Sequence, residues 1–129
     1  MLREDSGLDA VPYQWAAAGY MGAVNSGKTI CGILFGASIY LGFLNGRNSA
    51  EAPKLKDEGR LEAIKSVNNL FDGFIGHFGD TDCKALTDCD WSKADDVKRY
   101  FKDEIYINTC FRQFEYVVKQ CLNEKPSVV

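Results

Sequence analysis

Apolar residues recur along much of this chain at steps of three and four, which is the spacing of one face of an α-helix. The strongest run predicts a long helix over 57–79. Its apolar members are Leu61, Ile64, Val67, Leu70, Phe71, Phe74, Ile75 and Phe78. A second run predicts a last helix over 107–122. Its stripe contains Ile107, Cys110, Phe111, Phe114, Val117, Val118 and Cys121. No stretch alternates apolar and polar residues for long enough to predict a β-strand.

The segment 29–44 is apolar on nearly every face, a pattern typical of a central helix rather than a surface helix. Glycines recur four residues apart on one side of it, first Gly32 and Gly36, then Gly42 and Gly46. Each glycine inside a helix costs about 1 kcal/mol relative to alanine. Such a cost is tolerable where another backbone approaches closely, so this helix is also the expected contact of a homodimer.

Two shorter helices are predicted from their start signals. Asp9 can cap a helix over 13–23. The Ser-Lys-Ala-Asp sequence of residues 92–95 resembles a capping box at the start of another helix. Together with a polar connector over 48–56, these elements predict a single all-α domain over residues 1–129. We expect a small bundle of four to five helices around the central, glycine-rich apolar helix.

Composition narrows the functional classes. The 129 residues are 46% hydrophobic, which is enough apolar material for one buried core. The net charge of −3, with 15 Lys and Arg residues scattered along the chain, argues against nucleic-acid binding. The most apolar segment, 29–44, is shorter than the roughly 20 residues of a membrane span. The first residues lack the pattern of a secretory signal, so we expect a cytoplasmic protein without membrane contact.

One segment matches a nucleotide-binding motif. Residues 22–29, Gly-Ala-Val-Asn-Ser-Gly-Lys-Thr, satisfy the phosphate-loop pattern G-x-x-x-x-G-K-[ST]. A phosphate loop follows a buried β-strand, whereas residues 11–21 contain a proline, three alanines and a glycine rather than a β-branched run. No apolar strand ending in aspartate follows downstream to complete a magnesium site. We interpret the glycines as a turn between two helices, which leaves nucleotide binding as the least favoured function.

The cysteines carry the candidate chemistry. Five is an odd number and too few for a disulfide scaffold, so we expect free, metal-bound or redox-active thiols. Cys31 lies near the start of a predicted helix, whose N-terminus can stabilise a thiolate, although spacing alone favours a small buried hydrophobe. Cys83 and Cys89 lie six residues apart in the loop-like segment 80–91, which is the spacing of neither a redox pair nor a zinc knuckle.

A site would have to combine cysteines from separate elements. Cys110 and Cys121 share a helix face but stand roughly 16 Å apart along the axis, so they cannot bind one ion. Cys31, Cys83 and Cys110 are therefore the candidate set, because each comes from a different element. The single histidine, His77, is expected to have a surface or capping role.

Three cysteine-bearing stretches share a further pattern. Residues 27–37 read Gly-Lys-Thr-Ile-Cys-Gly-Ile-Leu-Phe-Gly-Ala. Residues 78–86 combine Phe-Gly with Cys-Lys-Ala-Leu, and Asp-Trp-Ser follows at 90–92. Cys110 then begins an apolar stretch with two valines. Over residues 7–122 this pattern resembles the C-GCAxxG-C-C family, to which a redox activity is ascribed without an established reaction.

The resemblance implies an all-helical fold related to the non-haem domain of split-Soret cytochromes. It also implies that Cys31, Cys83 and Cys110 act as redox thiols or as ligands of a thiolate-bound metal such as an iron–sulfur cluster. The family usually opens with a cysteine-bearing helix, and no cysteine precedes Cys31 in this chain. We therefore expect that helix to be truncated or diverged here. Cys89 and Cys121 match no family position.

Two functional hypotheses follow. The favoured one is a redox-active or metal-binding cysteine protein that acts with a redox partner protein. The alternative is a structural or assembly module that pairs through the glycine-rich helix and keeps its cysteines inert. No C-x-x-C-H motif is present for covalent haem, and the substrate stays open.

Overall fold

The computed structural model describes residues 19–27, 29–51 and 56–124, and within these ranges the chain is mostly helical. The elements are α3 (Tyr20–Val24), α4 (Gly32–Glu51), α5 (Lys56–Phe78), α6 (Cys83–Thr87), α7 (Ala94–Lys102), the π-helix η2 (Tyr106–Cys110) and α8 (Phe111–Asn123). The described residues contain no β-strand beyond one isolated bridge. The predicted all-α fold is confirmed, with α6 as an additional short helix inside the segment that we expected to be a loop.

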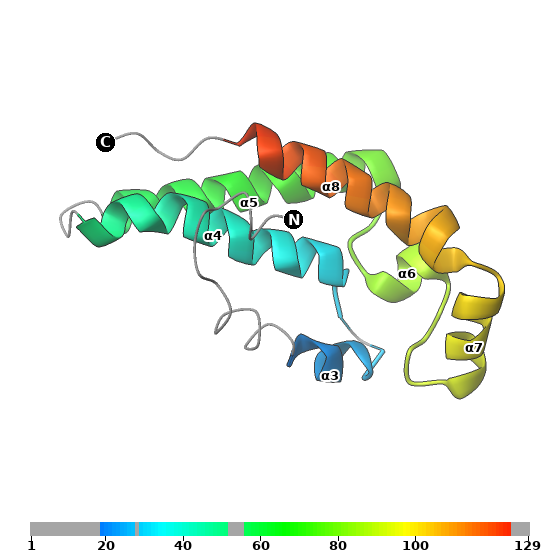
Figure 1. Cartoon of the computed structure of the whole chain (residues 1–129). Coiled ribbons are helices and arrows are strands. Elements are labelled where there is room, and N and C mark those ends of the chain that lie inside the picture. Colours follow the sequence, from blue (N-terminus) through cyan, green and yellow to red (C-terminus); the bar gives the residue numbers. More distant parts are fainter. Residues whose placement is uncertain (1–18, 28, 52–55, 125–129) are drawn as a thin grey trace.

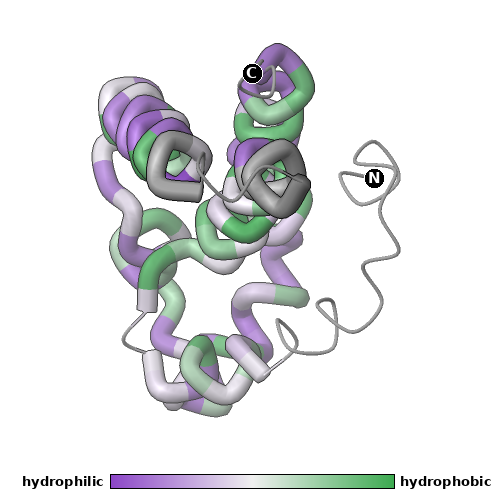
Figure 2. The backbone as a smooth tube through the Cα atoms, turned by 90° about the vertical axis from the view of Figure 1, so that its left-hand side faces the viewer, coloured by the Kyte–Doolittle hydropathy of each residue, from purple (hydrophilic) through white to green (hydrophobic). Residues whose placement is uncertain are grey.

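Three long helices build the body of the molecule. Figure 1 shows α4, α5 and α8 running side by side, with α6 and α7 beyond the end where α4 begins, α5 ends and α8 begins. In the end-on view of Figure 2, α4 lies between and below α5 and α8. Contacts of α4 with both of these helices agree with its predicted central position. Across the described ranges, each helix is too short or too polar to span a bilayer.

The core forms where these three helices meet. Leu34, Ala37 and Leu41 of α4 pack with Phe74 of α5 and Val117 of α8, and Phe74 is fully buried. Burying such side chains contributes roughly 1.5–3 kcal/mol each. The other side of α4 is more open than its sequence suggests, because Gly32 and Gly36 are exposed within the described structure.

The start of α4 differs from the prediction. Residues 29–31 are not helical: Ile30 forms an antiparallel bridge with Asp82, and α4 begins at Gly32. The Cys31 N–H donates to the Thr81 carbonyl at 2.7 Å. This pairing between two distant segments of the chain satisfies backbone groups that a helical turn would otherwise use. At its other end α4 extends to Glu51, into the predicted connector 48–56, of which residues 52–55 lie outside the described structure.

Of two other predicted helix boundaries, one is confirmed and one is wrong. The helix α5 agrees with the predicted 57–79 and ends before Gly79, which has a φ of 91°. The capping box at Ser92 is wrong: its hydroxyl donates to the Asp90 carboxylate, and α7 begins at Ala94. A nearby acceptor competed for the hydroxyl that would have capped the helix.

The two remaining predicted helices, 107–122 and 13–23, lie near the ends of the described chain. The predicted last helix, 107–122, is confirmed as a continuous helical segment, but its first turn is the π-helix η2, which ends at Cys110 where α8 follows directly. Single π-turns within α-helices occur frequently at functional sites. Of the predicted helix 13–23, only residues 19–23 lie in the described structure, and they belong largely to α3.

Candidate functional site

The antiparallel bridge brings two predicted site cysteines together. On either side of the Ile30–Asp82 pair, the Cys31 N–H donates to Thr81 and the Cys83 N–H donates to the Thr29 carbonyl at 3.1 Å. Residues that follow a paired position on both strands point to the same face, as diagonal neighbours. Diagonal neighbours have Cα atoms about 7–8 Å apart, with their Cβ atoms closer. The bridge therefore aims the Cys31 and Cys83 side chains at the same space.

Cys110 joins this pair from the opposite end of the chain. It is the last residue of η2, and the Tyr100 hydroxyl of α7 donates to its Sγ at 3.3 Å. The element η2 also packs against α6, which begins with Cys83. Three elements that are distant in sequence thus converge at one end of the bundle.

The thiols of the bridge pair are held in their neutral form. Burial is the main cause that raises the pKa of Cys31, and the charge of a Cys110 thiolate adds to the rise. The backbone N–H groups of Ile33 and Leu34 at the start of α4 lower the same pKa, but burial outweighs them. Burial, followed by charges on Cys31 and Cys110, raises the pKa of Cys83 to about 11. Cys31 is buried, as spacing alone favoured, and burial outweighs the helix N-terminus that could have stabilised its thiolate.

Two polar residues of this cluster were not identified from the sequence. Gln113 is only 2% exposed, and its Oε1 lies 4.0 Å from Cys31 Sγ, which donates to it. Gln113 lies three residues after Cys110, so both side chains are on neighbouring turns of one helix face. The second is Tyr100 of α7, whose hydroxyl donates to Cys110 Sγ. The available signal was Gln113 itself, a polar residue within the otherwise apolar stripe of the last helix.

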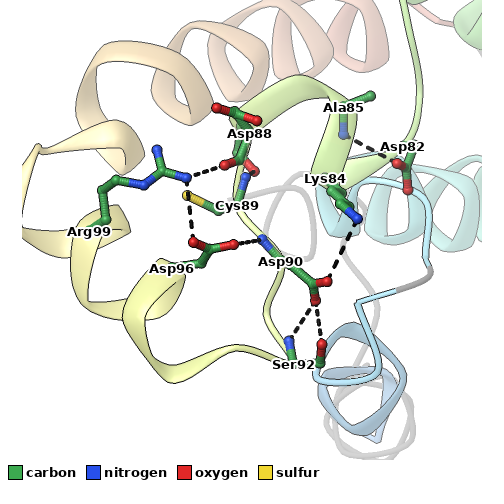
Figure 3. Close-up of polar contacts among 10 residues, drawn as sticks. Asp82, Lys84, Ala85, Asp88, Cys89, Asp90, Ser92, Asp96 and Arg99 are labelled. Carbon is green, nitrogen blue, oxygen red and sulfur yellow. Dashed lines mark hydrogen bonds and ion pairs between the residues drawn. The ribbon is translucent and has the colours of Figure 1, made fainter.

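A polar network fixes the segment between Cys83 and Tyr100 (Figure 3). The Arg99 guanidinium donates to the Asp88 carbonyl and lies 3.8 Å from the Asp96 carboxylate. Asp96 in turn accepts from the Asp90 N–H at 2.9 Å. The Asp90 carboxylate accepts from Ser92 and pairs with Lys84 at 3.7 Å. Individual exposed ion pairs contribute little, but this network links α6 to α7 and so sets the position of Tyr100 relative to Cys83.

The remaining two cysteines, Cys89 and Cys121, lie outside this cluster. Cys121 is buried among the core residues, and burial, with the Glu124 charge, raises its pKa to about 12. Cys89 is buried beside Arg99 and Asp96 in the loop before α7. All five cysteines are free thiols. His77 is exposed and stacks on Tyr116 with ring centroids 4.8 Å apart, in keeping with its expected surface role.

The phosphate-loop match has a different structural explanation. Residues before and within its first half are helical, because α3 spans Tyr20–Val24. Gly27 has a φ of 72°, which glycine adopts readily, and its Cα faces the Asp90 carboxylate. A negative carboxylate beside the glycine turn would repel a phosphate. Lys28 lies outside the described residues.

The thiols as placed do not form a closed metal site. Across 19–27, 29–51 and 56–124, no group of three or more His, Cys, Asp or Glu side chains lies in an arrangement that could hold a metal ion. Zinc or iron thiolate sites need sulfurs about 2.3 Å from a common ion.

Comparison with known proteins supplies one match. A sequence model of the family described as "Putative redox-active protein (C_GCAxxG_C_C)" matches residues 1–122. This confirms the resemblance found over residues 7–122 and extends it to the first residue. No curated protein and no solved structure gives a significant match.

Proposed function

Because the chain belongs to the C-GCAxxG-C-C family, whose description names a redox activity, we propose that Cys31, Cys83 and Cys110 carry that activity by reversible thiol–disulfide exchange. The observation that supports this most directly is the convergence of three free thiols from α4, α6 and η2 at one end of the bundle. Thiols in a reducing cytoplasm would start the cycle in the free form.

The exchange needs a disulfide as the electron acceptor, either a low-molecular-weight disulfide or a disulfide on a redox partner protein. One protein thiolate attacks a sulfur of the acceptor and releases its first thiol. A second protein thiol then attacks the mixed disulfide and releases the second. The protein loses two protons and two electrons to form one S–S bond, and the acceptor becomes two thiols. A disulfide needs Cα atoms within about 4.4–6.8 Å, so the bridge must tighten slightly if Cys31 and Cys83 are joined.

Metal binding is the second use of the same residues. Three thiolates form a donor set suited to soft metals and iron–sulfur clusters. The proposed exchange uses the thiols alone, and none of its steps involves a metal ion. Metal analysis of anaerobically purified protein distinguishes metal binding from thiol–disulfide exchange. If the protein holds a stoichiometric metal that is lost only when Cys31, Cys83 or Cys110 is replaced, exchange is not its principal activity.

The test of exchange is oxidation of the full chain with oxidised glutathione, followed by peptide mapping without reduction. We expect two thiols per chain to disappear, to return with dithiothreitol, and to lie within the set Cys31, Cys83 and Cys110. Replacing any one of the three by alanine should change which pair forms or abolish it. Cys89→Ala is the matched control, because Cys89 is buried outside the cluster and its loss should leave the disulfide unchanged. A disulfide through Cys89 or Cys121, or none at all, would refute the proposal.

The assembly alternative is supported by one observation. Gly32 and Gly36 are exposed on α4, and a Cβ added at either would meet nothing within 4 Å in the described structure. The close backbone contact that would explain these glycines is thus not provided by the described part of this chain, and a second copy would provide it. This hypothesis keeps the cysteines inert and assigns the helix face to a homodimer.

Substitution of Gly36 tests that alternative. In the monomer, Gly36→Ala should raise the free energy of unfolding by about 0.5–1 kcal/mol, because alanine is the better helix former and space is open. If α4 pairs, sedimentation equilibrium should show a dimer that Gly36→Leu dissociates. Gly76→Leu on the exposed side of α5 is the control, since its site is equally open. A monomer at all concentrations, or equal effects of both leucines, would exclude pairing through this face.

A further inference from the structure

We propose that Cys110 is the thiol that attacks the incoming disulfide, and that Tyr100 is the positioning residue that holds its sulfur for the attack. This rests on the proposed exchange and deepens it by assigning an order to the three thiols. Three observations support this order. Cys110 accepts a hydrogen bond from a side chain, Cys31 is buried and donates one, and neighbouring rings hold the Tyr100 donor in place.

The Tyr100 hydroxyl is directed at one of the three site sulfurs. It donates to Cys110 Sγ at 3.3 Å, and this bond becomes charge-assisted, and stronger, when the sulfur is a thiolate. Burial, followed by this bond, raises the pKa of Tyr100, so the hydroxyl keeps its proton and remains a donor at neutral pH. Tyr100 therefore stabilises the nucleophilic form of Cys110 without giving up a proton.

Aromatic neighbours fix the Tyr100 ring. Its centroid lies 5.0 Å from that of Trp91 and 5.2 Å from that of Phe101, both in edge-to-face geometry, and 6.1 Å from that of Tyr106. Such contacts contribute about 0.5–1.5 kcal/mol each beyond burial. The network around Arg99 holds the helix that carries the ring. The donor is thus preorganised by α7 rather than by Cys110.

The other two thiols are poorer first nucleophiles. Cys31 is 5% exposed and donates its own hydrogen to Gln113, so its sulfur is neither accessible nor supplied with a side-chain donor. Cys83 is half-buried, as Cys110 is, but burial and the neighbouring sulfurs raise its pKa more than Thr87 lowers it. The Thr87 hydroxyl donates to the Cys83 carbonyl at 2.7 Å. Both thiols are suited to the second step, in which a thiol needs to reach a neighbouring sulfur rather than an incoming molecule.

In the proposed order of steps, every bond formed and every proton moved is accounted for. The Cys110 thiolate forms an S–S bond with one sulfur of the acceptor RSSR, and the other sulfur leaves as RS⁻ and takes up the proton that Cys110 had lost. Cys83 or Cys31 then loses its proton and attacks Cys110 Sγ, and the second RS⁻ leaves and is protonated. The products are one protein disulfide that includes Cys110 and two RSH molecules.

The first test is the order of alkylation in the reduced full chain. Limiting iodoacetamide at pH 7, followed by peptide mass spectrometry, should label Cys110 before Cys31 and Cys83. This measurement needs no substitution, so it does not depend on the stability of any variant. Labelling of Cys31 or Cys83 first would overturn the assignment.

The second test is Tyr100→Phe, which removes the hydroxyl and keeps the ring. We expect alkylation of Cys110 at pH 7 to slow about tenfold, since a hydrogen bond to a charged group is lost. The rate should rejoin that of the unmodified chain at alkaline pH, where a thiolate forms without the help of a hydrogen-bond donor. A purely structural effect would slow the reaction at every pH. The other titratable groups whose charges act on the Tyr100–Cys110 pair are Cys31 and Cys83.

Tyr106→Phe is the matched control, because Tyr106 touches the same aromatic cluster and is 40% exposed. It should leave the pH profile of Cys110 alkylation unchanged. An unchanged profile in Tyr100→Phe, or an equal change in both variants, would refute the role of Tyr100. The outcomes also distinguish the order of attack from the exchange itself. If a disulfide forms but Cys110 is not alkylated first, only the proposed order is refuted. If no disulfide forms, the exchange is refuted.

Discussion

Replacing Phe74 with alanine should lower the free energy of unfolding by about 3–5 kcal/mol, as measured by urea denaturation. The Phe74 ring is fully buried where α5 meets α4 and α8, and it packs on Phe78 and Tyr116 with centroid distances of 4.8 Å and 6.4 Å. Removing the ring loses its burial energy and leaves a cavity that rigid helices fill only in part. A domain of this size has a total stability of about 5–15 kcal/mol, so much of it would be lost.

Ile75→Ala is the control on the same helix. Ile75 is the next residue, has a similar helical propensity cost and is 45% exposed. Its replacement should change the free energy of unfolding by less than about 1 kcal/mol. Comparable losses in both variants would show that the core does not lie where the three long helices meet.

The second large effect is expected at Gly27, where alanine should cost about 2–4 kcal/mol. Two causes combine. The φ of 72° places the residue in the left-handed region, which L-residues other than glycine adopt at a cost of about 1–2 kcal/mol. In addition, a Cβ at this position would overlap the Asp90 carboxylate, which holds Ser92 and Lys84.

Two other glycines separate these causes. Gly79 also has a positive φ, of 91°, but a Cβ there meets nothing within 4 Å, so Gly79→Ala should show the backbone cost alone. Gly22 is in α3 with open space, so Gly22→Ala should be neutral or stabilising by up to about 1 kcal/mol. Adding Asp90→Ala to Gly27→Ala should recover part of the loss, because it removes the overlapping side chain. Equal losses at Gly27 and Gly79 would mean that the turn does not pack on Asp90.

The packing of Gly27 on Asp90 also explains why this segment matches the phosphate-loop pattern without a phosphate site. In a phosphate loop the glycines open the backbone amides to a bound anion, and the loop follows a strand. Here the glycine turn follows α3 and is closed by a carboxylate from the segment before α7. The same residue pattern therefore serves a turn packed on the cysteine-bearing segment.

The helices could be predicted from periodicity because a helix face repeats in the sequence. The run from Leu61 to Phe78 predicted α5 within one residue at each end, since its apolar positions and the terminal Gly79 are local signals. The start of α4 was missed because residues 29–31 pair with Thr81–Cys83, a partner fifty residues away that no local pattern reveals. Ser92 was misassigned as a cap for the same kind of reason, since Asp90 competes for its hydroxyl.

By itself, the sequence determined the all-α class and the central place of the glycine-rich helix, because these follow from local periodicity. It also led to the proposal of Cys31, Cys83 and Cys110 among five cysteines, which follows from residue types in the family pattern. Only the tertiary structure decided that burial outweighs the helix N-terminus at Cys31, and that Tyr100 and Gln113 contact the site sulfurs. The physical reason is that desolvation and hydrogen-bond partners depend on which distant segments pack together, and in this chain a two-stranded bridge and a π-turn control that packing.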